Sequence, residues 1–500
     1  MDQTVAEEAR PAVAVPRRGL VLAASLMAIF MPAVESSIVA TALPTIIGHL
    51  GGFHLFSWVF AVPLLTMAVT IPLYGRLADI YGRRQVFFTG TAIFLIGTAL
   101  CGFARSMELL IVFRAIQGIG AGAIQPIAMT IIGDIYTPTE RARIQGAMSA
   151  VWGFAAVVGP ATSAFLVETV HWSIVFWVNL PIGVVSLAMF AVFLSEQVER
   201  RPHRIDFLGG ALLIVGVGAL MLALVQALNF GGTTIAALVV VGVGALAWLL
   251  VHESRVPEPM LPLGLWRQRV LALCNIGGFT ASATYMAVSA LLPIYVQGAM
   301  GYSAAVSGFV VGAASVSWMV ASIVAGRLMV HTSYRLTFAI GGASLIAGSA
   351  VLLTLDAGSG VAWPVAGSLL IGNGMGFCNT TFIVAIQGTV AWRERGVATG
   401  SQMFMRMIGM SVGAALFGAI VNFGVNRQLP GVGDSVNRLL LPETRGALDP
   451  EQIARLADAI AVAAQGAFLI ATLIGVATLV LVFAFPRGLS PTRTAEARSG

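Results

Sequence analysis

Ionisable side chains inside long apolar stretches are the residues of this sequence most able to do chemistry. Glu35 is the one carboxylate deep within such a stretch, and Arg114 and Arg406 are arginines in the same kind of setting. Charge in hydrocarbon is expensive and normally marks a partner or an ion path. Arg114 therefore needs an anion, and Glu35 is a group that can take up and release a proton.

Glu35 and Arg114 are expected to lie at similar depth. At about 1.5 Å per residue, Glu35 is about 24 Å from the start of its stretch at Gly19, and Arg114 is about 8 Å below the opposite edge of a core of roughly 30 Å. Burial disfavours a charged carboxyl group and a nearby Arg favours it, so the protonation state of Glu35 could switch as its surroundings open and close. The alternative is a static buried salt bridge between two helices, and both roles can coexist.

Arg406 has no acid of the C-terminal part of the chain placed to meet it. It could bind a polar or anionic substrate group in a cavity, hydrogen-bond backbone carbonyls, or approach Glu35. Because Gly409, Gly413 and Gly418 follow it, close helix packing is the competing interpretation.

The elements that must position these residues are membrane spans. Of all residues, 58% are hydrophobic and 10% are charged, which excludes an ordinary soluble domain. Apolar stretches of about 20 residues recur along the chain, and each is long enough to cross a bilayer. We expect an all-α integral membrane protein with fourteen spans, at roughly 19–43, 55–75, 86–104, 109–132, 144–166, 173–194, 207–228, 234–252, 270–293, 304–326, 336–354, 362–387, 397–423 and 465–485.

The loops between the spans carry most of the charge. The net charge of +6 comes from arginines in these loops, so it indicates membrane topology rather than nucleic-acid binding. With the N-terminus inside, the short outer loops hold only Arg105, which places both termini in the cytoplasm. The three cysteines lie in apolar stretches and the six histidines in loops or at span ends, so no disulfide framework and no metal site is indicated.

The chain divides into two related halves. The tripeptide Gly-Arg-Leu at 75–77 recurs at 326–328, and glycines spaced two apart in the fourth span recur in the twelfth. Related halves around a central site are how many secondary transporters are built. The expected organisation is a cytoplasmic tail at 1–18, a six-helix half at 19–200, two linker helices at 201–256, a second six-helix half at 257–485 with a periplasmic loop at about 424–464, and a cytoplasmic tail at 486–500.

The periplasmic loop contains a helix-start signal at 449–451, followed by apolar residues at helical spacing. A short amphipathic helix lying on the outer surface is one interpretation. A solvated connector is the other.

The loop after the second span reads Gly-Arg-Leu-Ala-Asp-Ile-Tyr-Gly-Arg-Arg from 75 to 84 and resembles the signature loop of the major facilitator superfamily. Its glycines allow close helix approach, and Asp79 can accept hydrogen bonds or pair with Arg to stabilise one packing of the halves. The resemblance implies a gating loop formed by Gly75, Arg76, Asp79, Gly82, Arg83 and Arg84. A tight basic turn that only anchors topology is the alternative.

Further motifs resemble those of the fourteen-span drug:proton antiporters of that superfamily, the QacA-like and EmrB-like transporters. The segment from Glu35 to Pro44 is similar to their first-span signature, in which the family usually has Asp in place of Glu35. The fourth span is similar to the second signature of the superfamily through Arg114, Gln117, Gly118 and Gly120.

The fifth span resembles the antiporter signature through Gly153, Gly159 and Pro160. Ser163 and Ala164 replace the last glycine pair of that signature, so small side chains are kept but the pattern is incomplete. A proline bend with a purely structural role is the competing interpretation.

A substrate cavity is expected between the halves. Pro63 stands where the family commonly has Tyr, so the second span should bend there and one possible substrate hydrogen bond is missing. Large or polar residues within the spans are candidates for its lining, although each could instead face lipid or packing: Trp58, Phe60, Tyr285, Tyr295, Trp318, Asn373, Asn379, Gln387, Phe404 and Arg406.

The resemblance implies a proton-coupled secondary transporter of the bacterial inner membrane that exports lipophilic or amphipathic drugs and so contributes to antibiotic resistance. Glu35 would take a proton outside, substrate would leave, and the proton would be released inside. The alternatives are a proton symporter that imports an organic acid, and a non-transporting membrane sensor. No enzyme is expected, because no spanning His or second acid could build a catalytic centre.

The expected partners follow from this interpretation. They are a small-molecule substrate, protons and the lipid bilayer, with the proton-motive force in place of any cofactor and without nucleic acid. We expect a monomer, and whether a periplasmic adaptor protein joins it is open.

Overall fold

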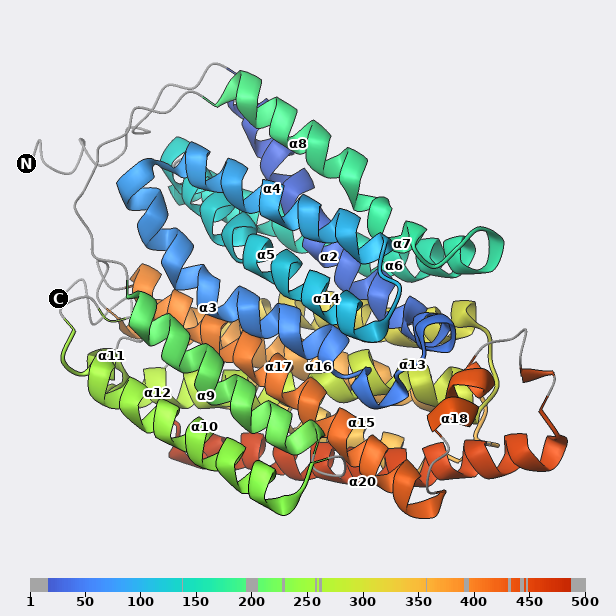
Figure 1. Cartoon of the computed structure of the whole chain (residues 1–500). Helices are drawn as coiled ribbons and strands as arrows, with labels where there is room; N and C mark the ends of the chain where they lie inside the picture. Colours follow the sequence, from blue (N-terminus) through green and yellow to red (C-terminus); the bar gives the residue numbers. More distant parts are fainter. Residues whose placement is uncertain are drawn as a thin grey trace, which may run out of the picture.

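The computed structural model describes residues 17–136, 138–194, 206–226, 230–256, 259, 263–356, 358–390, 395–429, 433–440, 445–446 and 448–486. Within them the chain is helical and contains no strand. The helices run close to parallel along one axis, as Figure 1 shows. The fold is all-α, as the sequence predicts.

The long helices follow the predicted spans closely. Among the described residues, thirteen helical segments are long and apolar enough to cross a membrane. The predicted fifth span lies in α6, of which only 151–167 count as a shorter apolar run, so the number fourteen stays a prediction. The helices of the first half are α2 (Arg18–Leu50), α3 (Trp58–Tyr81), α4 (Arg83–Gly102), α5 (Met107–Ile135), α6 (Pro138–Thr169), α7 (Ile174–Trp177) and α8 (Asn179–Phe193), with the short turn η1 (Phe53–Leu55).

The remaining helices form a linker pair and a second half. The linker helices are α9 (Phe207–Val225) and α10 (Gly232–Glu253). The second half contains α11 (Leu263–Trp266), α12 (Arg269–Met286), η2 (Ala287–Leu291), α13 (Leu292–Ile294), η3 (Tyr295–Ala299), α14 (Ala304–His331), α15 (Tyr334–Leu353), α16 (Ala362–Thr389), α17 (Arg395–Gln428), α18 (Gly433–Leu440) and α20 (Pro450–Ala484).

Helix pairings in one half recur in the other. In the first half α5 packs between α3 and α4 while α2 packs on α6; in the second, α16 packs between α14 and α15 while α12 packs on α17. The repeated glycines lie at these contacts. A Cβ at Gly118 would collide with Pro63 and Thr66 of α3, and one at Gly372 would collide with Ala314 of α14. Only glycine permits backbones to approach this closely.

The two halves meet along α6, α14, α2, α3 and α17, and the linker helix α9 contacts both α3 and α17. Figure 1 shows α9 and α10, in green, beside the orange α17. In the same view α2 begins and α20 ends at one end of the bundle, called the terminal end below. The other end, called the α18 end, carries α18. The sequence predicts that the terminal end faces the cytoplasm.

Contacts between the halves are well developed toward the α18 end. Gln297 Nε2 donates to the Thr41 carbonyl at 3.2 Å, and Asn422 Nδ2 donates to the His54 carbonyl at 2.8 Å. The short helix α18 lies across α2, η1, η3 and α20, with Val436 and Leu439 buried beneath it. Next to it Arg445 Nη1 donates to the Gln297 carbonyl at 2.9 Å, and burial lowers the pKa of the Arg445 guanidinium.

Much of the predicted periplasmic loop at 424–464 is helical in the structure. α17 continues to Gln428, and α20 begins at Pro450 and runs without interruption to Ala484. Pro450 is in the first turn, where its missing N–H costs nothing, and no later breaker stops the helix. Leu456 and Ile460 are buried, so the interpretation as a separate surface helix is wrong.

Candidate functional site

The buried pair Glu35 and Arg114 joins α2 to α5. Glu35 is 2% exposed and Arg114 is 7% exposed. Arg114 Nη1 donates to Glu35 Oε1 and to Gln117 Oε1, and its Nε donates to the Val59 carbonyl at 3.1 Å. The contact predicted from depth is therefore present. Its role in proton coupling stays a prediction.

Gln117 extends this pair into a polar network. Its Nε2 donates to Thr98 Oγ1 at 2.7 Å, and that hydroxyl donates to the Phe94 carbonyl at 2.7 Å. Cys101 Sγ lies 4.0 Å from Gln117 Oε1 as a weak donor. The network thus connects α2, α3, α4 and α5. Because Gln117 Oε1 accepts from Arg114, the guanidinium has a neutral acceptor in addition to the carboxylate.

The second carboxylate oxygen of Glu35 is not bonded. Glu35 Oε2 is buried and has no hydrogen-bond partner among the described residues. An unsatisfied buried acceptor is uncommon and calls for a specific explanation. A proton on Oε2 would remove the negative charge of the unbonded oxygen while Oε1 stays in contact with Arg114. The geometry can therefore accommodate both the charged and the neutral form of the acid.

The helix that carries the antiporter motif, α6, contacts both the acid-bearing helix and the other half. At Gly159 a Cβ would lie 2.7 Å from Ser37 Cβ and 3.2 Å from the Val34 carbonyl. Ser163 Oγ donates to the Ile38 carbonyl at 2.9 Å. On its other side, α6 places Pro160 against Gly308 and Gly153 against Met319, both in α14. α6 therefore connects the surroundings of Glu35 to the second half.

The signature loop lies at the terminal end, where α3 passes into α4. Gly82 adopts a φ of 94°, a conformation that side chains rarely tolerate, and its N–H bonds the Ala78 carbonyl at 3.0 Å. Arg76 Nη2 donates to the Pro259 carbonyl at 3.1 Å, beyond the linker helices. Arg84 Nη2 donates to the Ala191 carbonyl of α8 at 2.8 Å. Gly75 lies in α3 and Arg83 begins α4, whereas the Asp79 side chain is outside the described part of the structure.

Similarity to known proteins identifies the family of this chain. Residues 25–414 match the model of the Major Facilitator Superfamily. The multidrug transporter protein MdtP of Bacillus subtilis is 35% identical over 413 residues, which cover 81% of this chain and 76% of MdtP. Multidrug resistance protein 3 of the same organism is 33% identical over 427 residues, covering 84% of this chain and 81% of the relative.

The chain belongs to the major facilitator superfamily. Solved structures agree on the fold. A bacterial homologue of the human lysosomal transporter Spinster gives a TM-score of 0.65 at 13% identity, covering 95% of this chain and 98% of the homologue. The nucleoside transporter NupG gives a TM-score of 0.63, also at 13% identity, covering 93% of this chain and all of NupG. As a member of this superfamily the protein is a multi-pass membrane transporter, and the superfamily is not one of enzymes.

Two separate pairs of candidate cavity residues are in contact within the second half. The rings of Tyr285 and Trp318 are 5.2 Å apart and edge to face, and the Tyr285 hydroxyl lies 3.5 Å from Ser315 Oγ. Arg406 Nη1 donates to Asn379 Oδ1 at 3.5 Å, and its buried Nε has no partner among the described residues. Arg406 thus bonds a neutral amide rather than Glu35.

Most of the other candidates lie within packed surroundings. Tyr295 is fully buried against Phe468 of α20, and Asn373 Nδ2 donates to Ser344 Oγ of α15 at 2.9 Å. The side chains of Trp58, Phe60 and Phe404 are buried in the apolar core, and Gln387 is exposed.

The sequence alone does not single out Thr98 and Cys101, which extend the Glu35 network, or Ser163, which ties α6 to α2. Small polar residues are common in apolar spans, where most of them bond their own helix carbonyls. The available signal is spacing, because Thr98 and Cys101 lie three apart on one face of a helix. That spacing does not reveal which neighbouring helix the face meets.

Proposed function

We propose that the protein exports lipophilic or amphipathic small molecules across the bacterial inner membrane in exchange for protons, using the proton-motive force and no cofactor. The observation that carries this proposal is the buried contact of Glu35 with Arg114, in which Glu35 Oε2 remains unbonded. The printed names of the relatives, a multidrug transporter and a multidrug resistance protein, support a drug-like substrate.

Charge balance explains how proton binding would drive a conformational change. With Glu35 charged, the pair is neutral overall. A proton on Glu35 cancels the carboxylate charge and leaves the Arg114 cation in an apolar interior with only neutral acceptors, Glu35 Oε1, the Gln117 amide and the Val59 carbonyl. A buried cation without a counter-charge is costly. Proton binding therefore favours any conformation in which water or substrate reaches Arg114.

The contacts of α2 would transmit that preference. Ser163 holds the Ile38 carbonyl and Gln297 holds the Thr41 carbonyl, so the helix that carries Glu35 is bonded both to α6 and to the second half. A conformation open at the α18 end must break the bond from Gln297. A ligand shifts such an equilibrium only if it binds the two states with different affinity. In this mechanism the proton and the substrate are the two ligands that do so.

The substrate class is proposed from the polar and aromatic groups of the second half. Tyr285 and Trp318 offer aromatic surface, and Asn379 and Arg406 offer polar groups. One spanning carboxylate against two spanning arginines disfavours divalent cations. Neutral, zwitterionic and monovalent compounds fit this charge inventory better, and a monomer suffices for the mechanism.

Proteoliposomes loaded with a compound panel test the proposal. We expect that substrate addition moves protons through the wild type and that the variant Glu35→Gln exchanges substrate for substrate without moving protons. Glu108→Gln is the matched control, because Glu108 is an exposed acid in the first turn of α5. Proton-coupled transport by Glu35→Gln at the wild-type rate would refute the assignment.

The second candidate is import of an organic acid together with protons. The observation that favours it is the unbonded Nε of Arg406, which could attract an anion. The direction of transport separates the two candidates. In inside-out vesicles, an exporter accumulates substrate when the lumen is acidified, whereas an importer of this kind releases it.

A further inference from the structure

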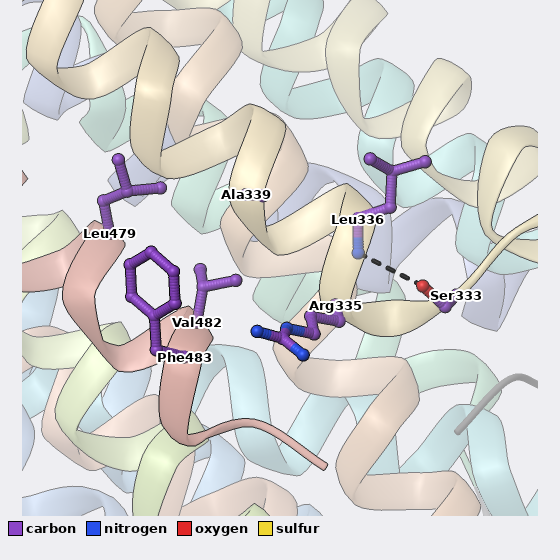
Figure 2. A pocket seen from close by; sticks show the side chains of 7 residues that line it. All are labelled: Ser333, Arg335, Leu336, Ala339, Leu479, Val482 and Phe483. Carbon is purple, nitrogen blue, oxygen red and sulfur yellow. Dashed lines mark hydrogen bonds between the residues drawn. The ribbon is translucent and has the colours of Figure 1, made fainter. Parts of the chain in front are cut away.

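A groove opens on the side of the bundle between the first turns of α15 and the last turns of α20. It has a volume of about 390 Å³. Figure 2 shows the side chains that line it: Ser333, Arg335, Leu336, Ala339, Leu479, Val482 and Phe483. It lies apart from the Glu35 network, and the proposed transport mechanism does not use it.

One side of the groove is cationic. Arg335 is half-buried and has no ion pair or hydrogen bond in the described part of the chain. In Figure 2 its guanidinium points toward Val482 and Phe483 across the groove. Arg335 is the second residue of α15, whose first turn adds the positive end of the helix dipole. Ser333 Oγ caps that turn by accepting from the Leu336 amide at 3.3 Å.

The other side of the groove is apolar and faces outward. It is formed by Leu479, Val482 and Phe483 of α20, and Phe483 is 74% exposed although it is a large hydrophobic residue. The two helices pack closely beneath the groove, because Gly342 of α15 contacts Leu479 of α20 and the Phe338 ring lies 5.9 Å from the Phe485 ring. A fixed groove thus combines an unpaired cation with an exposed apolar wall.

We propose that this groove binds an anionic phospholipid of the surrounding bilayer. Its phosphate would pair with Arg335, and its acyl chain would lie along Leu479 and Phe483. Both Arg335 and Phe483 are at helix ends, the level at which a spanning helix meets lipid headgroups. Basic pockets between helices on the cytoplasmic side are the kind that hold anionic headgroups.

The charge and shape of the groove favour an anionic phospholipid over free phosphate and over the C-terminal segment of the chain. Free phosphate could pair with Arg335 but would leave the apolar wall without a contact. The segment that follows Phe485 carries Arg487, Arg493 and Arg498 against one acid, Glu496, so it brings charge of the same sign as Arg335. An external anion with an apolar tail complements both sides of the groove.

Native mass spectrometry of the purified full-length protein tests the proposal. The protein is incubated with phosphatidylglycerol or with phosphatidylcholine, and the bound lipids are counted. We expect Arg335→Gln to lower phosphatidylglycerol occupancy about fivefold, the effect of one basic residue near a charged surface. Binding of phosphatidylcholine should not change. Arg335→Lys should keep most of the occupancy, and Arg327→Gln, which removes an exposed arginine of the same end, should match the wild type.

A second variant tests the apolar wall separately. Ala339→Trp fills the groove and leaves Arg335 in place, so it should also reduce phosphatidylglycerol occupancy. Inorganic phosphate at millimolar concentration should not displace the lipid. The proposal is overturned if Arg335→Gln retains as much phosphatidylglycerol as the wild type, if Arg327→Gln loses as much as Arg335→Gln, or if phosphate competes fully. Gel filtration of each variant verifies that it is folded.

Discussion

Replacing Gly159 by Ala tests whether close contact of α6 with the acid-bearing helix is needed for transport. The new Cβ would lie 2.7 Å from Ser37 Cβ and 3.2 Å from the Val34 carbonyl, the residues on either side of Glu35. Carbon atoms in contact are ordinarily about 3.5–4.0 Å apart, so α2 and α6 must separate by about 1 Å. Overpacking of this size typically costs about 1–3 kcal/mol.

The assay is efflux of a transported compound from proteoliposomes, together with thermal unfolding of the purified protein. A cost of about 1–3 kcal/mol on the described conformation corresponds to a change of about five- to two-hundred-fold in its population. We expect transport to fall at least about fivefold. Gly153→Ala is the matched control in the same helix, because its Cβ would meet the flexible end of Met319, which can move away. It should transport within about threefold of the wild type.

Second-site changes at Ser37 sharpen the test. Ser37→Gly removes the atom that clashes, and it breaks no hydrogen bond, since Ser37 Oγ has no partner among the described residues. The double variant Gly159→Ala with Ser37→Gly should recover most transport. The added glycine lowers the stability of the helix by about 1 kcal/mol, so recovery should be incomplete. Ser37→Ala keeps the Cβ and should not rescue. Wild-type transport by Gly159→Ala, or equal rescue by both Ser37 variants, would refute the reasoning.

Three further predictions concern the network, the α18 end and the substrate. Gln117→Leu removes one of the two neutral acceptors of Arg114, worth about 1.5–3 kcal/mol for a bond to a charged group, so proton-coupled transport should fall at least tenfold; an unchanged rate would contradict the network. A cross-link between cysteines at Thr41 and Gln297, whose side chain bonds the Thr41 carbonyl, should stop transport reversibly; full activity of the linked protein would show that the α18 end need not open. Trp318→Ala should raise the concentration of aromatic compounds needed for half-maximal transport about threefold or more, whereas Trp363→Ala, which changes an exposed residue, should not. Equal effects would exclude Trp318 from the cavity.

The helices could be predicted from the sequence because each span is a long apolar run. The pairing of Glu35 with Arg114 could also be predicted, since helical rise converts sequence position into depth and a buried arginine needs an anion. Helix ends were predicted less well. α2 continues past Pro44 to Leu50, and α20 fuses two predicted elements, because no residue there stops a helix whose tertiary contacts favour it.

The lateral direction of a side chain could not be predicted from depth. Tyr295 and Asn373 are at depths suitable for a cavity, yet Tyr295 packs on α20 and Asn373 bonds α15. The spans are apolar on all faces, so periodicity does not distinguish a lipid-facing side from a buried side. Only the small residues carry directional information, as at Gly118 and Gly372, where close approach selects the face.

The helix that carries Glu35 combines fixed and bendable segments. Pro32 and Pro44 lie within α2 on either side of Glu35, and each removes a backbone hydrogen bond. Between them the carbonyls of Ile38 and Thr41 are held by Ser163 and Gln297. A change of charge at Glu35 therefore acts on a short segment that can bend at its ends but is bonded to both halves. In the proposed mechanism, the effect of protonating Glu35 would reach both halves through these two bonds to the backbone of α2.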